Sequence, residues 1–274
     1  VRTPDEHFWV GHPPMAWKVP LVTLSYKWDA EQMFAWGAKG TTYTGAFLNG
    51  GVAIVDTPDQ RGNAPWKQQP RMYYTTDVRD HVTQAKFAHT PGTRFVAEDL
   101  SPLLVGVALE SALRKADPKA TLADYTSKQL WQPMGAEYPA QWVLDRADDG
   151  IEKTESGLVA RAIDFARFGQ LYLNRGRANG RQIVPETWVD ASVTAPSKGS
   201  PNLFIEGFHR KLWWGSFRPG RKQDDFYANG HFGQRIYVSP DKALVIVRMG
   251  HDGGDIDWTS FLATIADAWA TPVP

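Results

Sequence analysis

The sequence contains no cysteine, which excludes disulfide bonds, thiolate metal sites and a cysteine nucleophile. It also lacks an excess of charge, because 30 Lys and Arg residues balance 30 Asp and Glu residues, so no net field favours nucleic acid or anionic lipid. No apolar run approaches the roughly 20 residues that span a bilayer. The seven His residues show no metal-binding spacing. We therefore expect no metal, no cofactor, no nucleic-acid partner and no membrane span.

At 274 residues, the chain is long enough for one large domain or two closely packed ones. It starts at Val1 rather than at Met, which predicts processing or truncation. Cysteine-free chains occur among exported and cytosolic proteins alike. The sequence therefore leaves the compartment open between a bacterial periplasmic or secreted location and the cytoplasm, and it leaves the oligomeric state open.

The order of the expected elements predicts an α+β protein, with a helical region inserted into an antiparallel sheet. Strand-forming residues over 19–28 and 33–37 predict an N-terminal hairpin. Apolar spacing and capping residues predict helices within 73–90 and over 101–115, 121–130, 163–174, 185–192 and 258–269. Further strands are predicted over 213–217, 225–229, 234–238 and 244–249.

Three stretches of the sequence carry a family resemblance. They are 91–96 with 104–106, the long run over 130–189, and 230–247. Together they resemble the serine β-lactamase-like superfamily, also called penicillin-binding, which includes class C β-lactamases, DD-peptidases and 6-aminohexanoate-oligomer hydrolases. The resemblance implies a β-lactamase-like α+β fold, in which an antiparallel sheet is flanked by helices and the inserted helical region is reduced. It implies one unit over 1–274, with a sheet part at 18–37 plus 205–274 and a mainly helical part at 38–204.

Chemistry in this family needs three elements in one cleft: a Ser with a Lys one helical turn later, a Tyr-x-Asn turn, and a Lys/His-x-Gly strand. His231-Phe232-Gly233 matches the third element, ahead of a predicted strand. The resemblance implies that His231 polarises a substrate carbonyl or assists proton transfer, and that Gly233 shapes the oxyanion region. The alternative is a turn histidine without a role.

The Tyr-x-Asn position falls on Ala97-Glu98-Asp99. Ala97 cannot transfer protons, whereas Glu98 could act as an alternative base and Asp99 could accept the hydrogen bonds of the family's Asn. The alternative is a solvated acidic turn that caps the next helix.

The Ser-x-x-Lys element is not found in its expected place. One placement puts Gly40-Thr41-Thr42-Tyr43 on it, which replaces the nucleophile with Gly and leaves Tyr43 as a candidate base. A rival placement matches 41–52 to a later helix of the family, so that the whole element is missing. A literal Ser-x-x-Lys occurs at 239–242, but its Pro and Asp predict a hairpin turn rather than the helix that catalysis needs.

Several aromatic residues are candidates for lining a ligand cleft: Tyr73, Tyr74, Trp213, Trp214 and Phe232. Large aromatic rings are equally common in a hydrophobic core, so both interpretations stay open.

Three hypotheses follow for function. The first is a hydrolase of amide or ester bonds in small molecules. The second is a non-catalytic binding protein that retains the cleft for an amide- or peptide-like ligand. The third is an incomplete chain, in which the Ser-x-x-Lys segment has been lost.

Overall fold

The computed structural model describes residues 54–55, 77–83, 86–87, 95, 100–250, 253–254 and 256–269. The N-terminal hairpin predicted over 19–37 lies outside these residues. The chain divides into two compact units, which are treated separately: unit 1 is residues 1–126 with 139–159, and unit 2 is residues 127–138 with 160–274. The predicted single unit, with its sheet part at 18–37 plus 205–274, stays a prediction.

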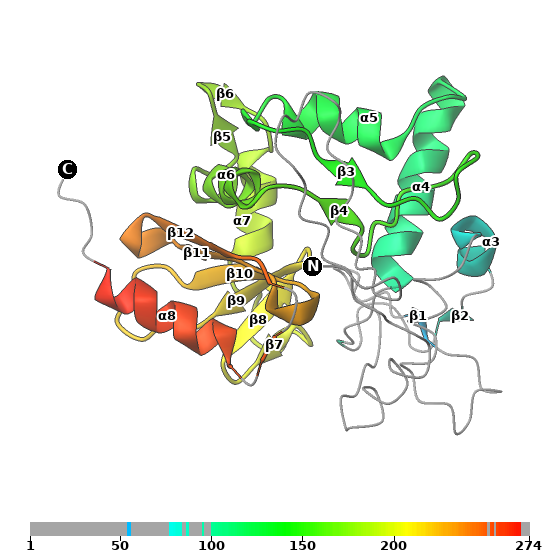
Figure 1. Ribbon diagram of the computed structural model, residues 1–274. Helices are drawn as coiled ribbons and strands as arrows, with labels where there is room; N and C mark the ends of the chain where they lie inside the picture. The colour runs from blue at the N-terminus through cyan, green and yellow to red at the C-terminus, as the bar shows by residue number, and fades with distance from the viewer. Residues whose placement is uncertain are drawn as a thin grey trace. The chain divides into compact units, whose positions relative to one another are not determined.

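Unit 2 is built on a six-stranded antiparallel sheet whose strands follow one another in chain order, from β7 at one edge to β12 at the other (Figure 1). The strands are β7 (Leu203–Phe204), β8 (Gly207–Arg210), β9 (Trp213–Ser216), β10 (Asp225–Asn229), β11 (Arg235–Ser239) and β12 (Leu244–Arg248). The last four confirm the predicted strands to within one residue at each end. The α+β class is likewise confirmed.

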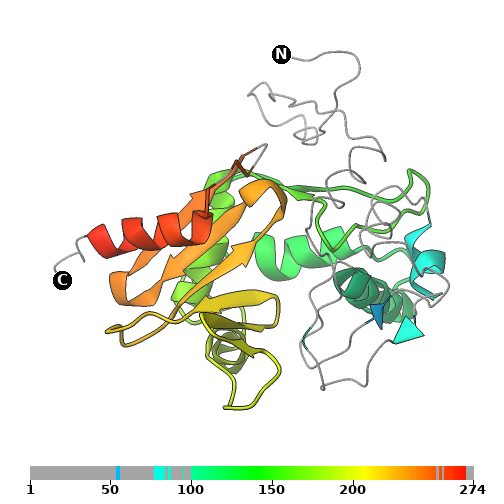
Figure 2. The same ribbon diagram turned by 90° about the horizontal axis from the view of Figure 1, so that it is seen from below.

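Helices cover both faces of this sheet (Figures 1 and 2). α6 (Ala162–Leu173) and α7 (Glu186–Val193) pack on one face, and α8 (Trp258–Ala268) packs on the other. Side chains of β11 point alternately to the two faces of the sheet, and both faces carry buried apolar residues. Val238 joins the apolar cluster on the α6 and α7 side, whereas its neighbour Tyr237 joins the cluster on the α8 side, and both side chains are fully buried.

Two local features bring the helices onto the sheet. A Cβ atom on Gly169 would lie 2.7 Å from Val245 and 2.8 Å from Ile236, so α6 approaches the sheet more closely than a larger residue allows. α8 is capped by Asp257, whose Oδ1 accepts hydrogen bonds from the backbone N–H groups of Thr259 and Ser260 at 3.1 and 3.2 Å. The predicted helices over 163–174, 185–192 and 258–269 are confirmed.

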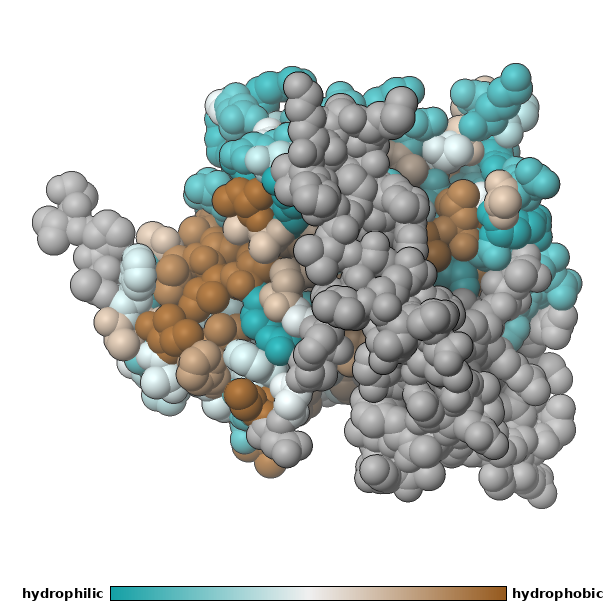
Figure 3. All heavy atoms as spheres, viewed as in Figure 1, coloured by the Kyte–Doolittle hydropathy of each residue, from teal (hydrophilic) through white to brown (hydrophobic). Residues whose placement is uncertain are grey.

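The remaining elements of unit 2 are short. They are the π-helix Ser127–Trp131, the hairpin of β5 (Arg177–Ala178) and β6 (Arg181–Gln182), and the 3₁₀ turns His231–Gly233 and Pro240–Lys242. Apolar side chains gather on the surface over β12 and the adjoining part of α8 (Figure 3). Exposed large apolar residues of these segments include Met249, directly after β12, and Phe261 and Ile265 of α8.

The described part of unit 1 contains short helices and two-stranded pieces. Its elements are β1 (Ile54–Val55), α3 (Val78–Thr83), β2 (Lys86–Phe87), α4 (Leu100–Ala116), α5 (Leu122–Thr126), β3 (Gln141–Trp142) and β4 (Leu158–Val159). Among the described residues of this unit, five buried apolar side chains form a core cluster: Val78, Val82, Leu103, Leu122 and Ile151. α4 confirms the helix predicted over 101–115, and Thr121 accepts the predicted capping hydrogen bond from the Asp124 N–H at 3.0 Å.

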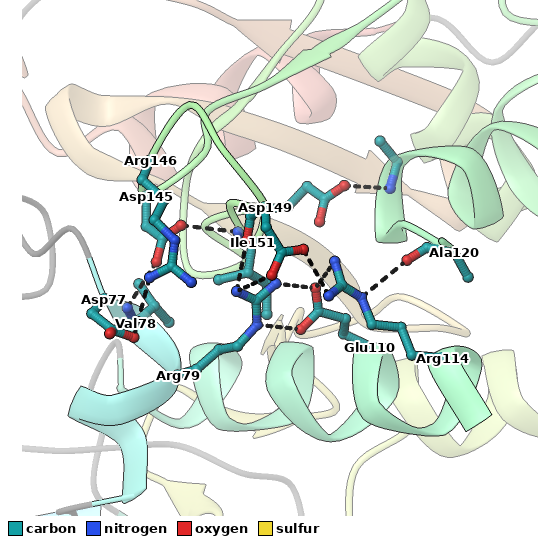
Figure 4. A network of polar contacts seen from close by, with 12 residues as sticks. Asp77, Val78, Arg79, Glu110, Arg114, Ala120, Asp145, Arg146, Asp149 and Ile151 are labelled. Carbon is teal, nitrogen blue, oxygen red and sulfur yellow. Dashed lines mark hydrogen bonds and ion pairs between the residues drawn. The ribbon is translucent and has the colours of Figure 1, made fainter. Parts of the chain in front are cut away.

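A buried carboxylate on α4 organises the polar part of unit 1 (Figure 4). Glu110 is 2% exposed and accepts hydrogen bonds from Arg79 Nε and Nη2 at 2.7 and 2.6 Å. Arg114 Nη2 lies 3.1 Å from the same carboxylate, and its other amino group is paired with Asp149 at 2.8 Å. Arg114 therefore lowers the pKa of Asp149. The two guanidinium groups together compensate the burial of Glu110.

A second carboxylate, Asp145, fixes the loop that follows β3. Its two oxygens accept hydrogen bonds from the backbone N–H groups of Val78 and Ile151, at 2.8 and 2.9 Å. Since both of those residues belong to the apolar core, Asp145 ties the loop and the start of α3 to it (Figure 4).

Candidate functional site

The motif His231-Phe232-Gly233 lies in the tight turn between β10 and β11, as the sequence predicts. The turn, residues 230–234, is called here the His231 turn. It is closed by hydrogen bonds from Gly230 N to Gln234 O at 2.9 Å and from Gln234 N to His231 O at 3.2 Å. Its central residues Phe232 and Gly233 have φ angles of 57° and 76°. Positive φ at both central positions is the property of a type I′ turn, which matches the twist of the flanking strands.

Phe232 is an unfavourable residue for this conformation, because a bulky side chain is rarely found at positive φ. Contacts around the turn hold it in place. Arg248 at the end of β12 donates a hydrogen bond from Nη1 to the Phe232 carbonyl oxygen. The amide of Gln234 pairs with the backbone of Gly250 in both directions, accepting from its N–H at 2.8 Å and donating to its carbonyl oxygen.

Arg248 is itself held by an aromatic ring. Its guanidinium carbon lies 4.1 Å from the ring centre of Trp258, the first residue of α8. The Trp258 indole N–H donates to the carbonyl oxygen of Gly253 at 2.6 Å. The His231 turn is thus connected to β12, to the chain after it and to α8, all within unit 2.

Position 233 requires glycine for two reasons: its backbone has a positive φ, and its surroundings leave no room for a Cβ atom. A Cβ atom at this position would lie 2.8 Å from both Arg248 Nη1 and Trp258 Cδ1. This side of Gly233 is therefore filled by the stacked pair. The imidazole of His231 is half-buried, and its ring centre lies 6.2 Å from that of Phe232.

The adjacent tryptophans of β9 lie on opposite faces of the sheet. Trp213 is 4% exposed and belongs to the α6 and α7 cluster, with its ring centre 4.6 Å from that of Tyr172. This burial favours the core interpretation for Trp213. Trp214 stacks on Tyr227 at 6.5 Å and contacts the edge of His209 at 4.6 Å on the other face. Only Trp214 keeps partial exposure.

The other predicted site residues lie outside the described part of the chain: Tyr43, Tyr73, Tyr74, Glu98 and Asp99. The structure therefore brings together His231, Phe232 and Gly233, and the roles of the remaining candidates stay predictions.

The literal Ser-x-x-Lys at 239–242 is not arranged for catalysis. Ser239 is fully buried at the end of β11, whereas Lys242 lies in the turn that follows. The Ser239 hydroxyl donates to Asp225 Oδ1 at 2.7 Å, and Lys242 Nζ donates to the carbonyl oxygen of Trp269 at 3.0 Å. The two groups have separate partners, which agrees with the predicted hairpin turn.

A groove of about 450 Å³ lies beside α8 in unit 2. Tyr227, Phe204, Arg218 and Asp267 are among the residues that line it. Arg218 donates to both oxygens of Asp267 at 2.6 Å, so these two charges compensate each other. Within the described ranges, no cluster of His, Asp or Glu is suited to hold a metal ion. No helix in that same part of the chain is long and apolar enough to cross a membrane.

Sequence reasoning missed Arg248 and Trp258 as neighbours of the motif. Each stands at the boundary of a predicted element, Arg248 near the end of a strand and Trp258 at the start of a helix. The sequence does contain one signal, since the charged Arg248 directly follows the apolar segment 244–247.

Comparison with known proteins agrees with the resemblance seen in the sequence. No family model matches the chain. The chain is 27% identical to 6-aminohexanoate-dimer hydrolase of Paenarthrobacter ureafaciens over 129 residues, which cover 45% of this chain and 32% of that protein. The chain thus matches about a third of the length of this curated relative.

Two solved structures share the fold. One, from Bacillus anthracis and named for a 6-aminohexanoate-dimer hydrolase, superposes with a TM-score of 0.63 and 24% identity over 87% of this chain and 64% of its own. The other, from Bacteroides dorei and named for a β-lactamase, has a TM-score of 0.51 and 15% identity over 71% of this chain and 65% of its own. The resemblance is therefore confirmed, and the chain has the α+β fold of the serine β-lactamase-like family.

Proposed function

We propose that this chain is a hydrolase-type protein that recognises and cleaves amide or ester bonds of small molecules, with the His231 turn forming part of its substrate site. The observation that carries the proposal is the sequence match to 6-aminohexanoate-dimer hydrolase, together with the ordered His-x-Gly turn at the start of β11. The linear dimer of 6-aminohexanoate contains one amide bond, which makes it the first substrate to test.

In this proposal His231 hydrogen-bonds the substrate carbonyl or assists proton transfer, as a half-buried imidazole at a turn can do. Gly233 shapes the region where negative charge develops on the carbonyl oxygen, since backbone N–H groups can approach a ligand closely at a glycine. Phe232 and Trp214 are candidates for contacts with the apolar part of the substrate. Glu98, Asp99 and Tyr43 are the candidates for the proton-transfer groups.

A second candidate function is ligand binding without turnover. The observation that favours it is that the Ser-x-x-Lys element is not found in its expected place: one placement puts Gly40-Thr41-Thr42-Tyr43 there, and the rival placement leaves the whole element missing. In either case the Ser nucleophile and the Lys base of the family are absent. Loss of both groups removes most of the rate enhancement of an acyl-transfer enzyme while binding survives. The ligand in this case is an amide or peptide-like small molecule.

Three measurements on the same preparation test both candidates. Intact mass is recorded after incubation with a penicillin and, separately, with a fluorophosphonate. Turnover of the 6-aminohexanoate dimer and of a p-nitrophenyl ester is followed, and binding of the dimer is measured by calorimetry. The hydrolase proposal predicts turnover that His231→Ala reduces, and His231→Gln, which keeps a hydrogen-bond donor, reduces less.

The outcomes separate the candidates. A stoichiometric adduct identifies a serine nucleophile, and peptide mapping then names it. Binding of the dimer without adduct or turnover supports the binding protein. Folded protein that neither binds nor cleaves any of these compounds contradicts both.

A further inference from the structure

Arg248 makes two directed contacts at the His231 turn that few other side chains could make together. Its Nη1 donates to the carbonyl oxygen of Phe232, and its guanidinium plane lies over the ring of Trp258 at 4.1 Å. A charged donor strengthens the first contact, and the electron-rich ring face favours the second. A planar guanidinium satisfies both, whereas the compact ammonium of a lysine does not present the same surface.

The hydrogen bond to the Phe232 carbonyl oxygen also fixes the orientation of the whole Phe232–Gly233 peptide. The described chain contains no cis peptide bond, so the Phe232 carbonyl and the Gly233 N–H lie in one rigid plane and point in opposite directions within it. With the carbonyl directed at Arg248, the Gly233 N–H must point away from Arg248. The side chain on β12 therefore sets the direction of a backbone donor in the motif.

The conformation that Arg248 helps to hold is a costly one for Phe232. Phe232 has φ 57° and ψ 25°, a region that a bulky residue occupies only when surrounding contacts impose it. Without Arg248, one of the contacts that impose this conformation is lost, and the Phe232–Gly233 peptide has more freedom to rotate. The direction of the Gly233 N–H would change with it.

Stability of the sheet does not explain an arginine at this position. Arg248 and Arg235 are directly opposite each other on β12 and β11. Like charges at opposite positions of neighbouring strands destabilise a sheet. Arg235 is also partly buried, which makes the neighbouring charge more costly.

From these contacts we propose that Arg248, supported by Trp258, is a positioning residue that orients the Phe232–Gly233 peptide for recognition of a substrate carbonyl. The orienting role stands on geometry within unit 2. Its consequence for the substrate rests on the proposed function. Backbone N–H groups stabilise a developing oxyanion only when they already point toward it, so a reoriented peptide weakens this contact.

The test compares Arg248→Gln and Arg248→Lys with a matched control, Arg210→Gln. Arg210 is also a sheet arginine that donates to a backbone carbonyl, that of Thr194 at 3.2 Å, but it belongs to β8 rather than to the turn. Amide hydrogen exchange and chemical shifts of Gly233 and Gln234 are recorded by NMR for each protein, together with its thermal unfolding. Affinity for the 6-aminohexanoate dimer is measured in parallel.

We expect Arg248→Gln to shift the Gly233 amide resonance, to raise exchange at Gln234, whose N–H bonds to the His231 carbonyl oxygen, by about tenfold, and to weaken dimer binding by a similar factor, the loss of one charged hydrogen bond. Arg248→Lys should reverse part of these effects, and Arg210→Gln should cause none of them. Unchanged shifts at Gly233 together with unchanged exchange at Gln234 in Arg248→Gln would overturn the inference. If wild-type protein does not bind the dimer, the proposed function fails, but the NMR comparison still decides the positioning role.

Discussion

The Ser239 hydroxyl donates a hydrogen bond of 2.7 Å to Asp225 Oδ1, and both residues are completely buried. The other carboxylate oxygen accepts a hydrogen bond from the Tyr237 hydroxyl at 2.6 Å. Arg221 Nη1 in turn donates to Ser239 Oγ at 2.8 Å. The one literal Ser-x-x-Lys of the sequence is therefore part of a polar network that joins β10 to β11, and its serine is not presented to solvent.

Ser239→Ala should lower the free energy of unfolding by about 1–3 kcal/mol, because a buried hydrogen-bond donor to Asp225 is lost. The variant should leave unchanged any labelling by a fluorophosphonate or a penicillin. Thermal unfolding and intact mass, taken on the same samples, check both parts. Loss of labelling in otherwise folded Ser239→Ala would show that this serine is the nucleophile after all.

Gly233→Ala should destabilise unit 2 more than a matched substitution at Gly180. Both glycines have positive φ, 76° and 72°, so the backbone cost of adding a Cβ atom is similar. The Cβ atom at Gly233 would meet Arg248 and Trp258 at 2.8 Å, whereas nothing lies within 4 Å of one at Gly180. We expect Gly180→Ala to lower the free energy of unfolding by about 1 kcal/mol, and Gly233→Ala to lower it by about 1–3 kcal/mol more.

Denaturant unfolding of the two variants measures this difference. Equal costs would mean that the stacked pair moves aside freely, which would contradict the close packing of Gly233. The same samples show whether the added Cβ atom also weakens binding of the 6-aminohexanoate dimer.

The sequence predicts the regular elements of unit 2 well, because their signals are local. The bounds of β10 agree at every residue, and those of β11 and β12 within one residue, since apolar alternation and turn residues mark them. β7 and β8 were not predicted. They are held by pairing with β9 rather than by strand-forming residues of their own, as Gly207, His209 and Arg210 in β8 show.

One boundary failed for a different reason. The helix predicted over 121–130 ends as α5 at Thr126 and continues as the π-helix Ser127–Trp131. There the Gln132 N–H bonds to the Ser127 carbonyl oxygen, five residues back, at 3.0 Å. Such a change in hydrogen-bond register has no signature in residue type or spacing.

The candidate site could be predicted only in part. The His231 motif is local and was located correctly, but the contacts that hold it come from residues distant in the sequence. Arg248 is 16 residues from Phe232, and Trp258 opens a different element. Neither side chain belongs to a motif, so their convergence follows from the pairing of β11 with β12 and the packing of α8.

Glu110→Gln should destabilise unit 1 strongly. The carboxylate is buried between Arg79 and Arg114, and removal of its charge leaves the two guanidinium groups with only the exposed Asp149 as a shared counter-charge. We expect the free energy of unfolding to fall by about 2–4 kcal/mol. This is slightly less than the usual cost of breaking a buried ion pair, because both arginines keep partial contact with water. Hydrogen exchange of the α4 amides measures the change within unit 1.

The control for this substitution is Glu186→Gln in α7. Glu186 pairs with Arg175 at the surface, and both side chains are more than half exposed. An exposed pair contributes little, so this variant should unfold nearly as the wild type does. Similar effects of the two substitutions would mean that Glu110 is not the organising charge of unit 1.

Burial makes His209 a source of acid sensitivity. Its side chain is 3% exposed on β8, and burial lowers its pKa to about 3. The folded state therefore keeps His209 neutral at a pH where the unfolded chain, with an ordinary histidine pKa, takes up a proton. Between pH of about 6.5 and 3 the unfolded state binds more protons, so stability falls as pH falls, by up to about 1.4 kcal/mol per pH unit from this residue.

His209→Phe removes this titration while keeping an aromatic ring against Trp214. Urea unfolding between pH of about 4 and 7 should show a shallower loss of stability in the variant than in the wild type. Carboxylates titrate in both proteins over this range, so the difference between the two slopes reports His209 alone. Parallel slopes would mean that His209 is protonated in the folded state, which its burial against Trp214 argues against.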